Sequence, residues 1–291
     1  MCVTFMSYRR PMDTVAVITG GAGGMGVATA RIVGGRNQHV VLADVRDDRL
    51  DDATAALAEL GIAATGVHCD VTDRQAVDAL YAAATALGPV TAVVHTAGVS
   101  PAMGDAEYIM RTNVFGTVHV NEKFYAVAGS GGAIVNVASM AAHILPESLI
   151  PVDRFPGALQ DERGFLAAVL PACAVAGDEK RSAIAYGISK NFVKWYSSAH
   201  AERFNGRGLR IVSVSPGAVD TEMGRLEAAR GAAAVVADAA VPRWGTAEEM
   251  AELFAFCVSE RAGYLTGTDI LNDGGVVASI RERARVGVPG T

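Results

Sequence analysis

A tyrosine and a lysine stand four residues apart in the stretch Tyr186-Gly-Ile-Ser-Lys190. On a helix, positions i and i+4 share one face, so the lysine ammonium would lie one turn from the tyrosine phenol. A neighbouring positive charge favours the phenolate and lowers the tyrosine pKa from its ordinary value of about 10. Such a phenol can exchange a proton with an alcohol or a ketone near neutral pH. By itself, however, this spacing more often marks an ordinary surface pair.

A glycine-dense turn lies near the start of the chain. Residues 15–26 read Val-Ala-Val-Ile-Thr-Gly-Gly-Ala-Gly-Gly-Met-Gly, and a small-residue helix pattern follows over 27–33. A buried strand, glycines and a helix start are the arrangement that holds a dinucleotide pyrophosphate, because backbone N–H groups can approach the phosphates. Gly21, Gly23 and Gly26 fit G-x-G-x-x-G. The match is weak alone in a chain with 32 glycines, and the flanking strand and helix strengthen it.

An acidic residue, Asp44, ends the next apolar run, 39–44. It stands close to the offset of about 20 residues at which a carboxylate takes the ribose hydroxyls of NAD. A carboxylate there would repel the 2′-phosphate of NADP. Arg46 argues the other way, since it could pair with that phosphate, and a helix cap or turn residue is a less favoured interpretation of Asp44. Because the position of Asp44 suits a ribose contact, we expect NAD, with NADP less favoured.

Strand and helix patterns alternate along the chain. After the run that begins at Val15, apolar runs of strand length cover 39–44, 63–68, 90–95, 133–138, 209–215 and 268–272. Helical periodicity covers 49–60, 73–87, 105–127, 182–204, 224–240 and 246–258, where Thr246 is a plausible N-cap. The alternation predicts a single-domain α/β fold, a Rossmann-type doubly wound parallel sheet of about seven strands flanked by helices. We expect residues 1–13 to be a disordered leader, 14–277 the domain, and 278–291 a C-terminal tail.

Composition narrows the classes of function. The net charge of −6 argues against a nucleic-acid partner. A membrane partner is not expected, because no run of about 18 apolar residues appears, and the N-terminus has no apolar signal-peptide core. Four cysteines stand far apart, which predicts reduced thiols in a cytoplasmic protein and neither a disulfide framework nor a metal site: Cys2, Cys69, Cys173 and Cys257.

These motifs, in this order, resemble those of the short-chain dehydrogenase/reductase family over about 14–277. The cofactor motif is matched by Thr19-Gly20-x-x-x-Gly24-x-Gly26, and the C-terminal signature by Leu265-Thr266-Gly267 through Asp273-Gly274-Gly275. Asp70 matches the acid that contacts the adenine. The resemblance implies a cofactor site made of Gly20, Ala22, Gly23, Gly24, Met25, Gly26, Asp44, Asp70, Val71, Thr96, Ala97, Gly98, Tyr186, Lys190, Pro216, Gly217, Val219 and Thr221.

The resemblance also implies a catalytic tetrad. Ser139 would hydrogen-bond the substrate oxygen and stabilise the charge that develops there. Tyr186 would exchange the proton, and Lys190 would lower the pKa of Tyr186 and hold the nicotinamide ribose. Asn113, with a water, would relay protons from Lys190 to solvent. The hydride would pass directly between the carbinol carbon and the nicotinamide, so no metal is required.

Two features depart from the family pattern. His95 and Thr96 replace residues that are usually asparagines, so we expect altered local hydrogen bonding without loss of activity, and a catalytic role for His95 stays open. The stretch between Ser139 and Tyr186 is much longer than usual, which predicts an ordered, proline-containing insertion over about 141–182 beside the substrate mouth, with one short helix near 161–169. Some members that act on hydroxysteroids carry an insertion here, which hints at a bulky apolar substrate. His143 could reach a substrate, although a polar loop residue is the simpler interpretation.

The leading hypothesis is an NAD(H)-dependent oxidoreductase that interconverts a secondary alcohol and a ketone. The alternatives are an NADP(H)-dependent carbonyl or 3-oxoacyl reductase and, less favoured, a non-catalytic dinucleotide-binding sensor. The expected partner is a small-molecule alcohol or ketone. The resemblance further implies a homodimer or homotetramer, and the insertion would either reinforce or block the interface that many members build with the Tyr186 helix.

Overall fold

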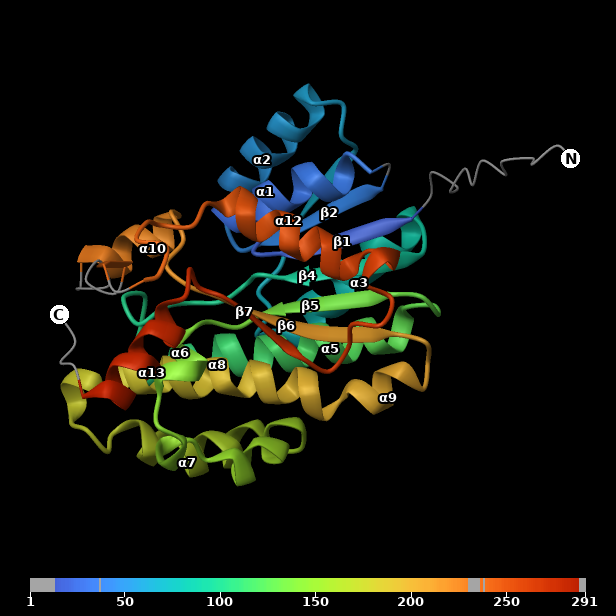
Figure 1. The fold of residues 1–291 in the computed structure, drawn as a ribbon. Helices are drawn as coiled ribbons and strands as arrows, with labels where there is room; N and C mark the ends of the chain where they lie inside the picture. Colours follow the sequence, from blue (N-terminus) through green and yellow to red (C-terminus); the bar gives the residue numbers. More distant parts are fainter. Residues whose placement is uncertain (1–13, 37, 230–235, 238, 288–291) are drawn as a thin grey trace, which may run out of the picture.

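A parallel sheet of seven strands forms the centre of the computed structural model, which describes residues 14–36, 38–229, 236–237 and 239–287. The strand order is β3-β2-β1-β4-β5-β6-β7 (Figure 1). The order therefore runs outward in both directions from β1 and β4, as the doubly wound prediction required. The bounds are β1 Val15–Thr19, β2 His39–Asp44, β3 Ala64–His68, β4 Val90–His95, β5 Ala133–Val137, β6 Arg210–Pro216 and β7 Asp269–Asn272.

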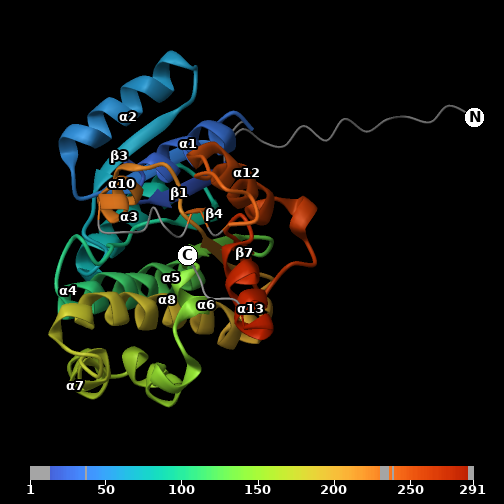
Figure 2. The same ribbon diagram turned by 60° about the vertical axis from the view of Figure 1, so that its left-hand side comes forward.

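Helices cover both faces of this sheet (Figures 1 and 2). One apolar layer lies beneath α1 (Gly24–Gly34), α2 (Asp47–Glu59) and α12 (Ala247–Val258). The opposite layer lies beneath α3 (Arg74–Leu87), α4 (Ala106–Met110), α5 (Gly116–Val127) and α8 (Arg181–Ala199), with the short α9 (Ala201–Asn205) after it. Because both faces are covered, β1 and β5 are buried along their whole length.

The single helix predicted over 105–127 contains a wider turn. Between α4 and α5, residues Arg111–Phe115 form the π-helical segment η1, in which the Gly116 N–H bonds to the Arg111 carbonyl. Asn113 lies in the middle of this segment. π-Helical turns inside α-helices are frequent at functional sites, so the segment around Asn113 is a candidate for such a site.

Residues 141–180 form a further layer outside α8. The sequence predicted one short helix near 161–169, whereas the structure contains α6 (Ala141–Ile144), η2 (Glu147–Leu149), η3 (Val152–Leu159), α7 (Glu162–Cys173) and η4 (Asp178–Lys180). Aromatic packing holds this layer in place. The buried rings of Phe155 and Phe165 lie 5.3 and 6.1 Å from the Phe192 ring of α8, and α7 runs alongside that helix (Figure 1).

The C-terminal part differs from the predicted tail. Helix α13 (Val276–Val286) occupies most of 278–291, because Asp273 accepts from the Val277 N–H in its first turn and Val276 and Val277 are buried against the rest of the fold. Residues 1–13 and 288–291, where a leader and the end of the tail were expected, lie outside the described residues.

Three further elements complete the C-terminal part. Helix α10 (Glu222–Glu227) covers the start of the helix predicted over 224–240, and much of the remainder also lies outside the described residues. Thr246 forms a full capping box with Glu249 at α12, as predicted for this N-cap, and η6 (Glu260–Ala262) follows. Within the described part, no helix has both the length and the apolar character to cross a membrane. Three cysteines there are buried free thiols: Cys69, Cys173 and Cys257.

Candidate active site

A cleft of about 410 Å³ opens at the carboxyl ends of the strands, where the strand order reverses. This is the position at which open α/β sheets bind ligands. Twelve of the residues that the sequence assigned to a cofactor line it: Gly20, Gly23, Gly24, Met25, Gly26, Asp44, Asp70, Val71, Thr96, Ala97, Gly98 and Thr221. The same cleft has side chains that the sequence analysis did not select, among them Arg49, Met103, Tyr108 and Leu226.

The glycine turn forms the floor of the cleft. Gly20 has a φ of 63°, and a Cβ there would lie 2.8 Å from both Ala97 N and Thr96 Oγ1. A Cβ on Gly26 would lie 2.3 Å from the Gly20 carbonyl oxygen, and one on Gly24 3.0 Å from Thr221 Cγ2. Helix α1 starts at Gly24 with no side-chain cap and no acid in its first turn, so its first N–H groups remain available to an anion. These residues fit a bound pyrophosphate.

Charged groups surround the other end of the cleft. The Asp44 carboxylate accepts from the Ala22 and Arg46 N–H groups at 3.2 and 3.3 Å. The Arg46 guanidinium bonds twice to Asp48, at 3.0 and 2.7 Å. Arg49 pairs with Glu222 of α10 at 2.6 Å. Both arginines that could meet a 2′-phosphate are therefore already paired with carboxylates.

Tyr186 and Lys190 share one face of α8, as the spacing predicted. Lys190 Nζ lies 5.8 Å from the centroid of the Tyr186 ring and donates to the Val137 carbonyl at 2.8 Å. Burial lowers the pKa of Lys190 from 10.5 to about 8. The lowered pKa expected for Tyr186 is a wrong prediction for this structure. Burial raises the pKa of Tyr186 above 10.0, and the hydrogen bond with Ser139 offsets only part of that effect.

Ser139 lies two residues after the end of β5 and acts on that phenol. Its hydroxyl accepts from the Ala141 N–H at 3.2 Å and lies close enough to the Tyr186 phenol to lower the pKa of that group. Strand β5 and helix α8 therefore bring together the two residues that the sequence assigned to the substrate oxygen.

Asn113 connects the η1 segment to the cleft and to α8. Its Oδ1 accepts from Val99 N at 2.9 Å, and its Nδ2 donates to Val99 O and Ser189 Oγ, both at 3.0 Å. A Cβ on Gly98 would lie 3.0 Å from Asn113 Oδ1 and 3.4 Å from Lys190 Nζ. Gly98 lines the cleft, so Asn113 and Lys190 lie immediately behind the cleft wall.

The two histidines left open by the sequence have defined partners. His95 is buried between Thr19 Oγ1 at 2.7 Å and Thr117 Oγ1 at 3.3 Å. Burial, aided by the Lys190 charge, lowers the pKa of His95 to about 3, so it is a neutral brace of the sheet. His143 is neither free nor a plain loop residue, because its Nε2 lies 2.7 Å from Asp269 Oδ2 on β7. The sequence analysis missed Asp269, although a carboxylate inside an apolar strand was a usable signal.

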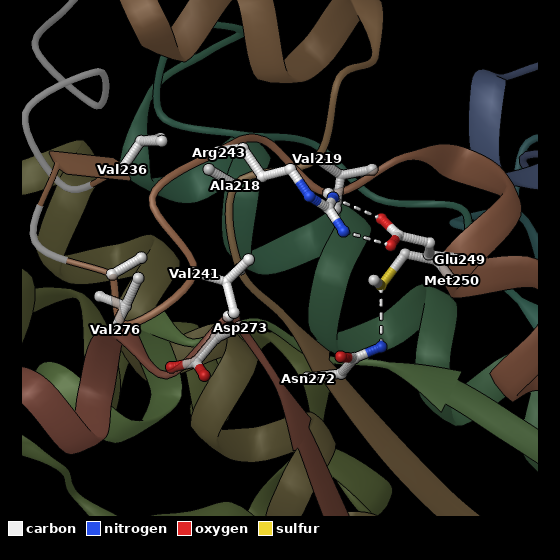
Figure 3. Close-up of a pocket in the computed structure, with 14 residues that line it drawn as sticks. Ala218, Val219, Val236, Val241, Arg243, Glu249, Met250, Asn272, Asp273 and Val276 are labelled. Atoms are coloured by element: carbon white, nitrogen blue, oxygen red, sulfur yellow. Dashed lines mark hydrogen bonds and ion pairs between the residues drawn. The ribbon is translucent and has the colours of Figure 1, made fainter.

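A second cavity of about 220 Å³ lies where β6 and β7 end (Figure 3). Gly217 and Val219, two of the expected cofactor residues, line this cavity and not the larger cleft. Its Arg243 points at Glu249 and forms two hydrogen bonds of 2.9 and 2.6 Å with it (Figure 3). The remaining wall combines apolar side chains with Asn272 and Asp273.

Comparison with known proteins places the chain in a family. Residues 14–150 match the model described as short chain dehydrogenase, and residues 169–277 match the model described as Enoyl-(Acyl carrier protein) reductase. A short-chain dehydrogenase/reductase of Alternaria brassicicola is 34% identical over 91% of this chain and 96% of its own length. The cis-4-hydroxycyclohexanecarboxylate dehydrogenase of Sinomonas cyclohexanicum is 28% identical over 91% of this chain and 97% of its own.

Solved structures share the fold. A short-chain dehydrogenase/reductase of Serratia marcescens superposes with a TM-score of 0.74 at 22% identity, covering 92% of this chain and all of its own. The chain belongs to the short-chain dehydrogenase/reductase family. It is therefore an oxidoreductase of a family that binds a nicotinamide dinucleotide, NAD or NADP, and acts on small molecules.

Proposed function

We propose that this protein interconverts a secondary alcohol and a ketone, with NAD(H) as cofactor and Tyr186 as the acid and base. The observation that carries the proposal is that Ser139 and Tyr186, delivered by different elements, lie close enough for the serine to act on the pKa of the phenol. Lys190, one turn from the phenol, lies against Gly98 in the wall of the glycine-floored cleft. A hydroxyl and a phenol that face each other can grip one substrate oxygen between them.

The chain's own residues account for the proton chemistry. At neutral pH the Tyr186 phenol is protonated, because its pKa is above 10.0, and it can donate a proton to a ketone oxygen. Ser139 holds the same oxygen and stabilises its developing charge. Lys190, with a pKa of about 8, is mostly charged at pH 7 and favours the phenolate that forms. The cofactor, when bound, would supply the hydride chemistry.

The preference for NAD rests on Asp44. Its carboxylate lies in the cleft and would repel a 2′-phosphate, while the guanidinium groups of Arg46 and Arg49 are paired with Asp48 and Glu222. An NADP(H)-dependent reductase is the second candidate, because the same two arginines line the cleft and could exchange partners. Initial rates with NAD and with NADP decide between them. A higher kcat/KM with NADP would overturn the role given to Asp44.

We infer a bulky apolar substrate. Met103, Tyr108 and Leu226 line the cleft and are 44–49% exposed, so apolar surface gathers at its open side. A relative of Mentha piperita, 28% identical, is named (-)-isopiperitenol/(-)-carveol dehydrogenase, and the Sinomonas relative is named for a cyclohexane carboxylate. Cyclic alcohols are therefore the first class to test.

The decisive experiment measures NAD reduction by absorbance with cyclic terpenols, substituted cyclohexanols, hydroxysteroids and sugar alcohols. We expect turnover with at least one cyclic alcohol. Tyr186→Phe should lower kcat on the order of 10²- to 10⁴-fold, because it removes the proton carrier. The same variant should change NADH affinity, measured by fluorescence, less than about threefold. A Tyr186→Phe protein that retains turnover would refute the mechanism.

A non-catalytic dinucleotide sensor is favoured by one observation. A relative of Xanthobacter autotrophicus, 32% identical over 78% of this chain, is named an inactive 2-(S)-hydroxypropyl-CoM dehydrogenase. Tight NADH binding without turnover of any alcohol or ketone in the panel would favour this function.

We also propose that the chain forms a homo-oligomer through its β7 edge. Phe155 and Phe165 pack against Phe192 of α8 within the same chain. This packing supports the alternative in which residues 141–182 block a subunit interface on that helix. Near the unpaired edge strand β7, Tyr264 is fully exposed and Phe256 is 38% exposed. Light scattering tests this proposal, and a monomer mass would remove it.

A further inference from the structure

A histidine and an aspartate form a buried pair that the proposed proton chemistry does not use. His143 Nε2 donates to Asp269 Oδ2 at 2.7 Å, and the two side chains are 13% and 9% exposed. The other carboxylate oxygen of Asp269 accepts from Ser213 Oγ at 2.6 Å and Ser215 Oγ at 3.0 Å. His143 Nε2 also lies 3.3 Å from Ser215 Oγ. One network therefore joins α6, β6 and β7.

The network holds a charge inside the protein. Burial by itself raises the pKa of Asp269, but hydrogen bonds with His143, Ser213 and Ser215 outweigh burial and keep it below 3.8. Well-packed apolar residues are often as stabilising as a buried polar pair, so such a pair adds little to stability. What it does provide is a defined geometry, since a carboxylate with three donors has one arrangement that satisfies them all.

The two ends of this network lie next to the candidate site. His143 is on the four-residue helix α6, which begins two residues after Ser139, and the Met140 N–H bonds to Pro216 O at 2.8 Å. Ser215 directly precedes Pro216 and Gly217 on β6. Asp269 thus holds the segment that carries Ser139 and the strand that delivers Pro216 and Gly217.

Helix α6 is also held in position by contacts with α8. Asn191 Nδ2 donates to Ala142 O at 2.8 Å. Leu145 Cδ2 lies 3.2 Å from where a Cβ on Gly187 would be, so it packs against the residue next to Tyr186. A shift of α6 away from β7 would therefore change the distance between Ser139 and Tyr186.

We propose that His143 is a positioning residue: by its bond to Asp269 it fixes the turn that carries Ser139 against Tyr186. The inference rests on the proposed function, in which these two hydroxyls grip one substrate oxygen. A displacement of about 1 Å at such a site can lower the rate on the order of 10²-fold. His143 itself touches no reacting atom and acts through Ser139.

The test compares His143→Leu, which removes the donor, with His143→Gln, whose amide N–H₂ can still reach Asp269. We expect His143→Leu to lower kcat on the order of 10- to 100-fold with little change in the KM for the alcohol, and His143→Gln to recover most of kcat. The matched control is His119→Leu. His119 is even more deeply buried, with 2% of its side chain exposed against 13% for His143, and it pairs with Glu162 at 2.9 Å, but it lies on α5. At saturating cofactor, its kcat should stay at the wild-type value.

A double variant separates positioning from the penalty of an unpaired buried charge. His143→Leu with Asp269→Leu removes the unpaired buried charge, although the buried hydroxyls of Ser213 and Ser215 lose their acceptor. We therefore expect the double variant to be more stable than His143→Leu but less stable than the wild type. Its kcat should nevertheless remain as low as that of His143→Leu. A double variant with wild-type kcat would overturn the proposal. If His143→Leu alone fails to fold, the kcat of the double variant is the test.

A second readout needs neither substrate nor cofactor. The ¹³Cζ chemical shift of Tyr186 at neutral pH, assigned with Tyr186→Phe, responds to the hydrogen bond of its hydroxyl. We expect it to move in His143→Leu, to return in His143→Gln and to stay in place in His119→Leu. An unmoved signal in folded His143→Leu refutes the positioning role. If the wild-type protein turns over no alcohol, the proposed function fails, yet this signal still tests the inference.

Discussion

The Lys190 ammonium lies over the Tyr186 ring, 5.8 Å from its centroid, and its 2.8 Å hydrogen bond goes to the Val137 carbonyl. The lysine is only 6% exposed, and burial disfavours its charged form. The buried Lys190 ammonium favours the Tyr186 phenolate, but its burial lowers the free energy of unfolding. This relationship leads to a prediction that does not depend on knowing the substrate.

Lys190→Met should stabilise the protein at neutral pH. The pKa of Lys190 is about 8 when folded and 10.5 in the reference state, so the unfolded chain binds more protons between these values. The stability of the wild type should therefore rise as pH rises from about 8 to 10.5. Below pH 8 the cost of the buried charge is fully present, on the order of 3 kcal/mol, less the hydrogen bond that methionine cannot make.

Urea unfolding of wild type and Lys190→Met at pH 7 and pH 10 measures this difference. The variant should be more stable at pH 7, and the gap should narrow at pH 10. Lys194→Met, one turn further along α8 and more exposed, is the control, and it should not stabilise the protein at pH 7. A Lys190→Met protein that is less stable than the wild type at pH 7 contradicts the prediction.

Asp44→Ser should move the cofactor preference toward NADP. It removes the charge that faces a 2′-phosphate and keeps a hydroxyl that can accept from Ala22 N. We expect the ratio of kcat/KM for NADP to that for NAD to rise about tenfold or more, equivalent to about 1.4 kcal/mol. Asp51→Ser, on the exposed side of α2, should leave the ratio unchanged. An unchanged ratio in Asp44→Ser would show that another residue selects the cofactor.

Gly26→Ala should impair both folding and dinucleotide binding. A Cβ there would lie 2.3 Å from the Gly20 carbonyl oxygen, so the backbone of the turn must move. We expect a loss of about 1–3 kcal/mol in the free energy of unfolding and a weaker NADH affinity by calorimetry. Gly129→Ala is the control, because a Cβ at Gly129 meets nothing within 4 Å. Wild-type affinity in Gly26→Ala would count against the turn as the pyrophosphate site.

Phe155→Ala should destabilise the protein by about 3–5 kcal/mol in chemical unfolding. Its fully buried ring packs against Phe192 and Trp195 at 5.3 and 5.5 Å, so truncation leaves a cavity between η3 and α8. Val152→Ala, in the same 3₁₀ segment but 44% exposed, should cost less than 1 kcal/mol. Equal effects of the two substitutions would mean that residues 141–180 are not part of the folded core.

Local patterns were sufficient for the sheet, the glycine turn and the N-cap at Thr246. Each depends on neighbours within a few residues: alternation of apolar runs and helical periods, glycines where a Cβ would collide, or a threonine just before a helical period. The same local rule placed Tyr186 and Lys190 on one helical face. The order of these motifs along the chain also carried the resemblance to the family, which the comparisons confirm.

Other properties depended on residues far apart in the sequence. Spacing alone suggested a lowered pKa for Tyr186, but the packing of α8 against the sheet buries the phenol and reverses the direction. The partner of His143 is 126 positions away, on β7. Most of the segment expected as a tail belongs to helix α13, whose first residues, Val276 and Val277, are buried against the rest of the fold. Desolvation and long-range pairing depend on which surfaces meet in three dimensions, and a linear pattern does not carry that information.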